Sequence, residues 1–597
     1  MAIPERKELN PEYTWSLEDL FECDEAWQAE FEWDKDYLDM VRDFEGTLGG
    51  SARILLNFLR LEDEMSEVFD RMANYAFRRA DEDTREAGPQ AMCAQLGSFL
   101  TQLNTAGSFS ANEILAIPDE TLERFYQEEP DLELYRRKLE LLRRRREHIL
   151  SPAEEKLLAM AGELGDNPDN IFSMLSDADL TFPDAVDGKG ETHTLTHGTY
   201  IPLMHSGDRA LRKSAFEGLY GVYGAHKNVL AATLAAQMKQ LWFFAQARKY
   251  PTALAAALDG TEVPEAVYHN LIAAVRENLP KMYRYVSLRK QLLGVEELHF
   301  YDLYADMVGD VEMSFTFEEA KEIALKALAP LGKGYCELLQ MGFDGGWIDV
   351  YENAGKRSGA YSAGAKVHPY VLLNFHGTLN DLFTLVHEMG HAIHSELSNT
   401  VQPTVYSDYV IFVAEVASTC NEALLMEYLL ANTTDKRQRA YLINYFLEQF
   451  RTTLYRQTMF AEFEEQVSEM ARKGEGVTAQ SCCALYRKLN EDYFGPDIVV
   501  DEEIALEWAR IPHFYYDFYV YQYATGYAAA IALSRRILRE GERAVKDYLS
   551  FLTGGCSKPP IELLKMAGVD MSTAEPVNQA LELFEELIGE MEALMAE

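Results

Sequence analysis

The sequence predicts a large, mainly α-helical protein with a small β-sheet. Two observations carry this fold class. Apolar residues recur at helical spacing through residues 16–150, 208–247 and 434–472. Glycine-rich, strand-like runs are confined to the segments 178–200 and 344–376. Because a hydrophobic content of 48% is ordinary for a chain with a full core, and because no repeat or low-complexity run divides it, we expect one or two large lobes.

The first 200 residues are expected to form an N-terminal helical region. Ser151 and Glu154 have the spacing of a capping box, so a helix should begin there and end near Gly165. Farther on, the turn DGKG and the alternating threonines of THTLTHGTY predict a small hairpin. We place the boundary at this hairpin, between an N-terminal region, 1–200, and a second region, 201–597.

The second region should contain further helices and the small sheet. Helices are expected over 208–247, 264–293 and 316–341. The runs 347–351 and 370–375 favour short strands between glycine-rich turns. This sheet is expected to lie beside the helix that follows it.

The helix expected at 378–399 carries the most specific motif of the chain, HEMGH at 387–391. Residues four apart on a helix lie one above the other, so His387 and His391 can present two imidazoles to one metal ion, which is half of a zinc site. Glu388 lies one step round the helix, where it can act on water as a general base. In a chain with 13 histidines an accidental HExxH is expected on the order of 0.03 times, so the motif is informative.

A third metal ligand must come from elsewhere. His394 falls on the same helix face, but three histidines at i, i+4 and i+7 stack along the axis, so a packing role is favoured for it. Glu415 and Glu422 lie on a second helix expected within 406–432. Glu415 follows an apolar run and is expected to be deep, where a carboxylate needs a partner or a metal. Two histidines and one glutamate with an open fourth position form a catalytic zinc arrangement.

The stretches VHEMGHAIHS and FVAEVASTCNE together resemble the M3 family of zinc oligopeptidases, and within it the oligoendopeptidase F group. Three further stretches are similar to that group: TWSLEDLF (14–21), KRSGAYS (356–362) and IPHFYYDFYVYQYATG (511–526). The resemblance spans nearly the whole chain. It implies one zinc ion per chain, held by His387, His391 and Glu415, with Glu388 as the general base. It also implies that 201–597, which contains the HExxH helix, is the catalytic domain.

The resemblance also implies an architecture and an activity. In the family, two helical lobes enclose a deep channel that admits short peptides and excludes folded proteins. We therefore expect a zinc-dependent endopeptidase that hydrolyses short oligopeptides. An open sheet edge beside such a site would bind an extended peptide by main-chain pairing.

A tyrosine-rich stretch downstream supplies candidates for stabilising the oxyanion that peptide hydrolysis develops. The resemblance assigns this role to His513 and to a tyrosine a few residues later. The family's spacing, carried over rigidly, falls on Phe518, so the choice stays open among Tyr516, Tyr519 and Tyr523.

Composition indicates which classes of partner the protein can bind. A net charge of −42 argues against nucleic-acid binding, which needs a basic stripe. The longest uncharged run, between Asp517 and Arg535, is too short to span a membrane, and the start of the chain carries no apolar signal core. Seven scattered cysteines without a CxxC pair suit reduced thiols. We expect a cytoplasmic protein that binds short peptides and neither nucleic acid nor a membrane.

Two alternative hypotheses stay open. Glu388 and His391 also match the ExxH pattern of ferritin-like di-iron proteins, and a second ExxH ends at His299. That second stretch looks strand-like, however, and His387 would have no role. The chain would otherwise be a non-catalytic helical protein that binds peptides. Identification of the metal separates the first alternative from a zinc peptidase, and the activity of a Glu388 variant separates the second.

Overall fold

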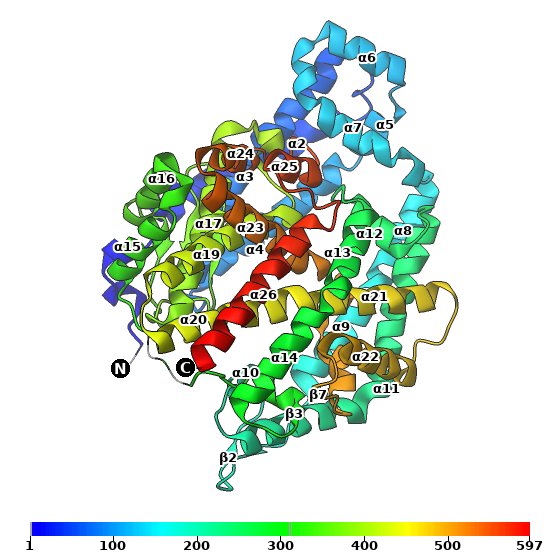
Figure 1. Ribbon diagram of the computed structural model, residues 1–597. Coiled ribbons are helices and arrows are strands. Elements are labelled where there is room, and N and C mark those ends of the chain that lie inside the picture. The colour runs from blue at the N-terminus through cyan, green and yellow to red at the C-terminus, as the bar shows by residue number, and fades with distance from the viewer. Residues whose placement is uncertain (1–2, 310, 312, 597) are drawn as a thin grey trace.

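The computed structural model describes residues 3–309, 311 and 313–596, which form a mainly helical molecule (Figure 1). The helices of the first part are α1 (Asp24–Asp34), α2 (Tyr37–Arg42), α3 (Ala52–Glu82), α4 (Ala87–Gly107), α5 (Ser110–Ala116), α6 (Asp119–Glu128), α7 (Arg136–Arg144), α8 (Pro152–Gly165), α9 (Asn167–Ser173) and α10 (His197–Met204). Those of the middle part are α11 (Arg209–Ala247), α12 (Ala253–Asp259), α13 (Glu265–Glu277), α14 (Leu279–Leu293), α15 (Phe317–Ala327) and α16 (Lys333–Asp344).

The last part contains the motif helix and the helices that pack around it. These helices are α17 (Leu379–Val401), α18 (Thr404–Ser407), α19 (Ile411–Asn432), α20 (Lys436–Gln449), α21 (Arg456–Arg472), α22 (Ala479–Phe494), α23 (Tyr521–Glu540), α24 (Glu542–Leu552), α25 (Pro560–Met566) and α26 (Glu575–Ala596). A π-helical segment, η9 (Phe450–Tyr455), joins α20 to α21, and two 3-10 segments, η10 (Ile504–Arg510) and η11 (Pro512–Tyr515), precede α23.

The strands are short and lie in small sheets. They are β1 (Ala185–Val186), β2 (Thr192–His193), β3 (Leu298–His299), β4 (Ile348–Asp349), β5 (Tyr361–Ala363), β6 (Tyr370–Leu372) and β7 (Ile498–Val499). The largest sheet has the order β4–β6–β5, with β4 parallel and β5 antiparallel to β6, so β5 is an edge strand. β3 pairs in parallel with β7, so the second ExxH motif ends in a strand and not on a bundle helix.

The β4–β6–β5 sheet connects the N-terminal helices to the motif helix. Successive residues of a strand point to opposite faces. Tyr370 and Leu372 of β6 pack into a core made by the first hundred residues, whereas Val371 packs into the main core with Val386 of α17. One face of the sheet thus packs against the N-terminal region, where Trp15 contacts the Tyr370 ring and Asp81 of α3 accepts a hydrogen bond from Tyr361. The other face packs against α17. In Figure 1 helices α3 and α4 lie behind α17 and α19, and α5, α6 and α7 project from the body.

Most of the expected elements are present, with differences at their boundaries. Ser151 and Glu154 form the capping box of α8, which ends at Gly165 as predicted. The segments expected as single helices at 264–293 and 316–341 are each broken in two, at Asn278 and around Gly332. Gly332 has a φ of 90°, which favours glycine and ends the helical path.

The predicted hairpin exists, but it is shorter than the threonine pattern suggests. β1 and β2 pair with Ala185 opposite His193. The next threonines do not continue the strand, because Thr196 accepts a hydrogen bond from the Thr199 N–H and caps α10. A threonine hydroxyl at a helix N-terminus outweighs the β preference of the alternating pattern.

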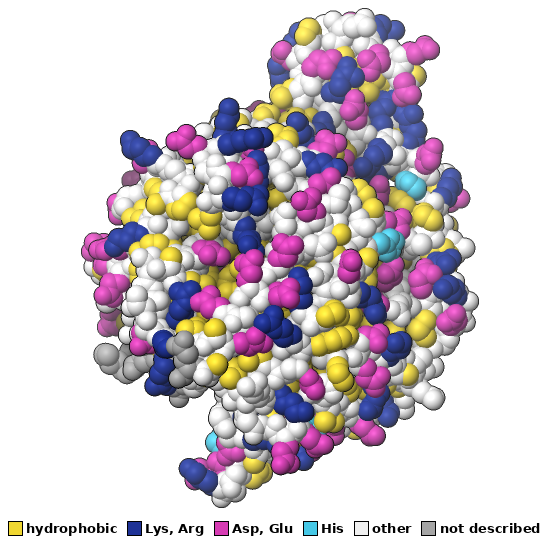
Figure 2. Space-filling model, viewed as in Figure 1, with side chains coloured by type: hydrophobic (Ala, Val, Ile, Leu, Met, Phe, Trp, Pro, Cys, Tyr) yellow, Lys and Arg dark blue, Asp and Glu magenta, His cyan; other side chains and the backbone are white. Residues whose placement is uncertain are grey.

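The surface carries both signs of charge, and the thiols are free. Over the face shown in Figure 2, acidic and basic side chains lie interspersed. All seven cysteines are free thiols in the structure. Within the described part of the chain, no helix combines the length and the apolar content that crossing a lipid bilayer requires.

Candidate metal centre

Helix α17 holds the HEMGH motif and begins as the sequence predicts. The Thr378 hydroxyl accepts from the Asp381 N–H at 3.2 Å, and the Asp381 carboxylate accepts from the Thr378 N–H at 2.8 Å. This capping box satisfies two backbone donors and fixes the helix start. Val386 and Met389 are fully buried on one side of the helix, while His387 and His391 on the other side line a cavity.

Gly390 allows the second helix, α19, to approach α17 closely. A Cβ at Gly390 would lie 2.6 Å from the Ser418 Cα and 3.0 Å from the Asn421 Nδ2. Asn421 then joins the helices, because its Nδ2 donates to the Val386 carbonyl at 3.3 Å and its Oδ1 accepts from Tyr335 at 2.9 Å. The motif glycine therefore makes room for the backbone of α19 and not for the histidine side chains.

His387, His391 and Glu415 converge on one point. The two Nε2 atoms lie 3.2 Å apart, and the Glu415 Oε2 lies 3.3 Å from the His387 Nε2 and 3.5 Å from the His391 Nε2. In a tetrahedral zinc site with bonds of about 2.0–2.1 Å, neighbouring ligand atoms are about 3.3–3.4 Å apart. The three donor atoms therefore form one face of a tetrahedron of the right size for zinc, with the fourth corner left for water or substrate.

Among the described residues, this is the one group of three or more His, Cys, Asp or Glu side chains close enough to share an ion. It contains the three ligands that the sequence predicts. Glu415 is not as deep as its apolar neighbours suggested, because 35% of its side chain is accessible and faces the cavity. The di-iron hypothesis loses its support, since its second motif lies in β3 and adds no ligand here.

Glu422 orients the first histidine. Its Oε1 lies 3.0 Å from the His387 Nδ1, on the same helix as Glu415 and two turns further on. A carboxylate that accepts from Nδ1–H holds the imidazole in the tautomer whose Nε2 carries the lone pair. The sequence places Glu422 on the right helix but gives no sign of this role, which depends on the spacing between α17 and α19.

Interactions among the predicted metal ligands raise the pKa of His387 and lower that of Glu415. Burial alone would lower the pKa of His387, but hydrogen bonds with Glu415 and Glu422 raise it well above its usual range. Burial alone would raise the pKa of Glu415, but hydrogen bonds with His387 and His391 lower it. The carboxylate thus stays ionised, as a metal ligand must be, and His387 must release a proton when a metal ion binds.

Glu388 and His394 occupy different surroundings on the same helix. Glu388 is buried but lines the cavity, and burial raises the pKa of its carboxyl group. His394 is fully buried, stacks on the Tyr409 ring with centroids 3.8 Å apart, and has a pKa lowered to about 3 by burial and then by His391. His394 is therefore a neutral packing residue, as the stacking argument predicted, and not a metal ligand.

The cavity in front of the donor atoms has a volume of about 660 Å³. One wall is the edge strand β5 with Tyr361 and Ser362, and another is α3 with Glu67 and Asp70. A hydrogen bond from Thr404 to Glu67 connects α3 to α18, the short helix that precedes α19. The sequence contains no signal for the α3 wall, because more than 300 residues separate it from the motif.

The tyrosine-rich stretch forms a cluster around His513. The rings of Tyr516, Tyr519 and Tyr523 have centroids 5.5, 6.3 and 5.9 Å from the His513 ring, and the Tyr523 hydroxyl lies 3.5 Å from the His513 Nε2. Tyr516 is 47% exposed, whereas Tyr523 is half-buried. Phe518, on which the family's spacing falls, is buried in the core and has no hydroxyl to donate.

Helix α23 connects this cluster to the metal ligands. A Cβ at Gly526 would lie 3.6 Å from the Glu415 Cβ, so the two helices touch at Glu415. Tyr523 lies one turn before Gly526, on the same helix face. Burial raises the pKa of Tyr523, and Tyr519 and then the charge of Glu415 raise it further. The Tyr523 phenol therefore interacts electrostatically with one of the predicted metal ligands.

Comparisons with known proteins agree with this geometry. Residues 202–583 match the sequence model described as Peptidase family M3, and residues 113–182 match that of Oligopeptidase F. The chain is similar to Oligopeptidase PepF of Bacillus subtilis (strain 168), with 47% identity over 594 residues, 99% of this chain and 89% of that protein. It is also similar to the plasmid Oligoendopeptidase F of Lactococcus lactis subsp. cremoris, with 39% identity over 592 residues, 99% and 98% of the two chains.

Solved structures show the same fold. The crystal structure of a putative peptidase from Chlamydophila abortus has a TM-score of 0.92 and 34% identity, and the likeness covers 99% of this chain and 100% of that one. The crystal structure of oligoendopeptidase-F from Enterococcus faecium has a TM-score of 0.75 and 37% identity, over 96% and 99% of the two chains.

Proposed function

The chain belongs to peptidase family M3, in the oligopeptidase F group, and we propose that it hydrolyses internal bonds of short oligopeptides with one zinc ion per chain. The observation that carries the metal assignment is the 3.2–3.5 Å triangle of His387, His391 and Glu415 donor atoms. Nitrogen and carboxylate donors in a tetrahedral arrangement with one open corner suit catalytic zinc. When bound, zinc would supply Lewis acidity, which polarises a carbonyl group and makes water more acidic.

Glu388 would move the protons of the reaction. The oxygen of the attacking water adds to the scissile carbonyl carbon, and the Glu388 carboxylate takes a proton from that water. The C–N bond then breaks, and Glu388 passes the proton to the amine nitrogen, so the water is divided between the two products. The raised pKa of Glu388 supports this role, because a base that titrates nearer the working pH also returns its proton readily.

His513 and the neighbouring tyrosines would stabilise the oxyanion. Tyr523 is best supported among the three candidates, because its helix contacts Glu415 and its hydroxyl lies nearest the His513 Nε2. Tyr519 packs edge-on against Tyr523 with ring centroids 5.3 Å apart, and Tyr516 lies at the surface of the cluster. A phenol donates a hydrogen bond to developing negative charge without being ionised itself.

Strand β5 would position the substrate. Its far edge is unpaired within the sheet order, and Tyr361 and Ser362 line the cavity in front of the metal group. An extended peptide can add there as a further strand, with main-chain hydrogen bonds that do not depend on side-chain identity. Broad sequence tolerance follows from this mode of binding. The free thiols support the cytoplasmic location that the sequence predicts.

Mass spectrometry of a mixed peptide pool tests the proposal. We expect internal cleavage of short peptides by the zinc-loaded protein, its loss on chelation and its return when zinc is added back. Glu388→Gln should keep zinc, because Glu388 is not a ligand, but should lose turnover by several orders of magnitude. An unchanged rate in Glu388→Gln, or no cleavage by folded and zinc-loaded protein, would contradict the mechanism and favour a peptide-binding protein.

A further inference from the structure

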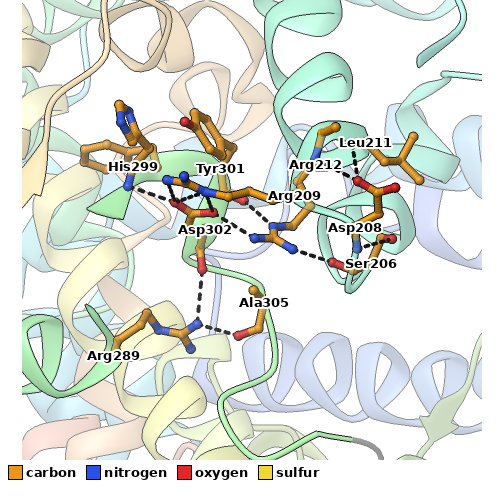
Figure 3. A network of polar contacts seen from close by, with 12 residues as sticks. Ser206, Asp208, Arg209, Leu211, Arg212, Arg289, His299, Tyr301, Asp302 and Ala305 are labelled. Atoms are coloured by element: carbon orange, nitrogen blue, oxygen red, sulfur yellow. Dashed lines mark hydrogen bonds and ion pairs between the residues drawn. The ribbon is translucent and has the colours of Figure 1, made fainter. Parts of the chain in front are cut away.

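Away from the metal group, the core contains three carboxylates that are each held by two arginines. The pairs are Arg209 and Arg212 on Asp302, Arg289 and Arg451 on Glu448, and Arg456 and Arg510 on Glu507. Figure 3 shows the first pair converging on Asp302, while Arg289 reaches the nearby carbonyl oxygen of Ala305. In a chain whose net charge is −42, this cluster carries six guanidinium groups and three carboxylates.

The Glu507 carboxylate accepts hydrogen bonds from three side chains. Its Oε1 accepts from the Arg456 Nη2 at 2.5 Å and from the Arg510 Nη2 at 3.1 Å, and its Oε2 accepts from the Tyr486 hydroxyl at 2.6 Å. Burial alone would raise the pKa of Glu507, but the two arginines lower it to about 2. The carboxylate therefore stays ionised, contributes one negative charge and accepts three hydrogen bonds from the protein.

The Glu448 group has the same arrangement. Arg289 donates to its Oε1 at 2.5 Å, and Arg451 donates to its Oε2 at 2.6 Å. Arg451 lies on the π-helical segment η9, which continues directly into α21 and Arg456. A π-helical turn shifts the side chains that follow it and is frequent at functional sites. Here it brings Arg451 and Arg456 to the same internal space.

That space is a small cavity of about 20 Å³, lined by Arg451, Arg456 and Arg510 and by the phenols Tyr200, Tyr220 and Tyr304. Of the described residues that line it, Glu507 is the one acid. Arg456 and Arg510 line this cavity, and 16% and 18% of their side-chain surface is accessible.

The guanidinium groups have donors to spare. Among the described residues, Arg456 donates only through Nη2, and Arg510 donates through Nη2 and through Nε, to the Tyr220 hydroxyl at 3.1 Å. A guanidinium stays charged in proteins, so these arginines cannot lose their positive charge by releasing a proton. Within the described part of the chain, the four arginines around these two carboxylates, Glu448 and Glu507, thus carry two positive charges in excess of the negative charges that they contact. Excess charge in a low-dielectric interior is unfavourable, and an anion would offset it.

We propose that this cavity binds one small monovalent anion, a halide such as chloride, between the guanidinium groups of Arg451, Arg456 and Arg510. Its volume holds about one water-sized species, which admits a monatomic ion and excludes phosphate or a peptide carboxylate with its chain. The anion accepts the spare N–H donors and halves the excess charge. None of the lining residues lines the cavity of the metal group, so the site is separate from the proposed substrate cavity.

The anion would stabilise the segment that leads to His513. Arg510 is the last residue of η10, and His513 lies in the following segment, η11. Binding at Arg510 therefore anchors η10 on α21, to which Glu507 and Arg456 already tie it. The consequence to measure is higher thermal stability in halide than in a large organic anion.

Crystals of the wild-type protein grown in bromide test the site directly. We expect one anomalous peak in this cavity, within hydrogen-bonding distance of the Arg456 and Arg510 nitrogens. A cavity that holds only water, in crystals whose surface sites contain bromide, would overturn the proposal. This experiment depends on no variant and on no catalytic activity, so it is independent of the proposed peptidase function.

Melting temperature in solution gives the second test. At fixed sodium and zinc concentrations, replacement of gluconate by chloride or bromide should raise the melting temperature with the logarithm of halide concentration. Arg456→Gln should weaken this halide dependence at least tenfold in apparent affinity, whereas Arg472→Gln should not change it. Arg472 is the matched control, because it lies on the same helix and pairs at the surface with Glu469. An equal response in gluconate and chloride, or an unchanged response in Arg456→Gln, would contradict halide binding.

Discussion

Replacement of Gly390 by alanine tests how closely the two metal-binding helices must approach. In an isolated helix this change is favourable by about 1 kcal/mol. In the protein the new Cβ would lie 2.6 Å from the Ser418 Cα, and ordinary contact begins at 3.4 Å, so α19 must retreat by about 0.8 Å. A backbone atom cannot rotate aside as a side chain can. Overpacking of this kind costs about 1–3 kcal/mol, so we expect a net loss of stability.

The same displacement should weaken the metal site. Glu415 lies one turn before Ser418 on α19 and moves with it. A shift of about 0.8 Å takes its present distances of 3.3 and 3.5 Å from the histidine nitrogens to about 4 Å, beyond the edge of a zinc tetrahedron. We expect zinc affinity to fall at least tenfold.

Competition with a chromogenic chelator measures the zinc affinity, and urea unfolding of the zinc-free protein measures the stability. Gly97→Ala in α4 is the matched control, because nothing lies within 4 Å of the new Cβ and the helix should gain up to about 1 kcal/mol. If Gly390→Ala were as stable as wild type and bound zinc equally well, the close approach at Ser418 would not set the geometry of the site.

Three further changes test two positions near the metal group and one buried acid elsewhere in the core. Glu422→Gln should weaken zinc binding about 10–100-fold in the same competition assay, because the His387 Nδ1 loses its charged acceptor, and equal affinity would refute the orienting role. Tyr523→Phe should lower kcat about 10²–10³-fold with zinc content unchanged, while the exposed Tyr516→Phe should have little effect, and the reverse order in peptide assays would move the oxyanion role to Tyr516. Burial raises the pKa of Glu464 to about 8, so between about pH 4.5 and 8 this group releases its proton in the unfolded chain but keeps it in the folded one. Over that range Glu464 alone lowers the free energy of unfolding by about 1.4 kcal/mol per pH unit. Glu464→Gln removes this loss, and its free energy of unfolding relative to wild type should rise from pH 5 to pH 8.5 in urea titrations. A constant difference would show that Glu464 is ionised in the folded protein.

Local chemical signals made part of the fold predictable. Thr378 and Ser151 begin helices because each has an acid three residues later to complete a capping box. The spacing of His387 and His391 fixes two ligands, since helix geometry alone places them together. Glu415 could be selected from its position on the next helix and from the family resemblance, but its distance to the histidines is a property of the packing between α17 and α19.

Features that depend on long-range packing left no pattern in the sequence. No local pattern shows that Gly390 faces Ser418, because that contact forms only when α19 packs against α17. The arginines around Glu448 and Glu507 are spread over several elements, so no local window reveals that the cluster lacks two negative charges. Sequence patterns record the neighbours of a residue along the chain, whereas the electrostatics of a buried group depend on its neighbours in space.

The two regions divided at residue 200 both contribute to the cavity, because α3 forms one of its walls. Glu67 and Asp70 line the same cavity as Glu388, and β6 inserts Tyr370 and Leu372 into the core of the N-terminal helices. The two regions thus share a core and enclose the cavity together. We propose that 1–200 and 201–597 are regions of one catalytic body.

A 201–597 fragment would expose the apolar face of β6 and lack a wall of the cavity, so it should not hydrolyse peptides even if it retained zinc. Addition of the 1–200 fragment should restore cleavage if the regions fold separately. Full activity of 201–597 alone would show that the N-terminal wall takes no part in holding the substrate.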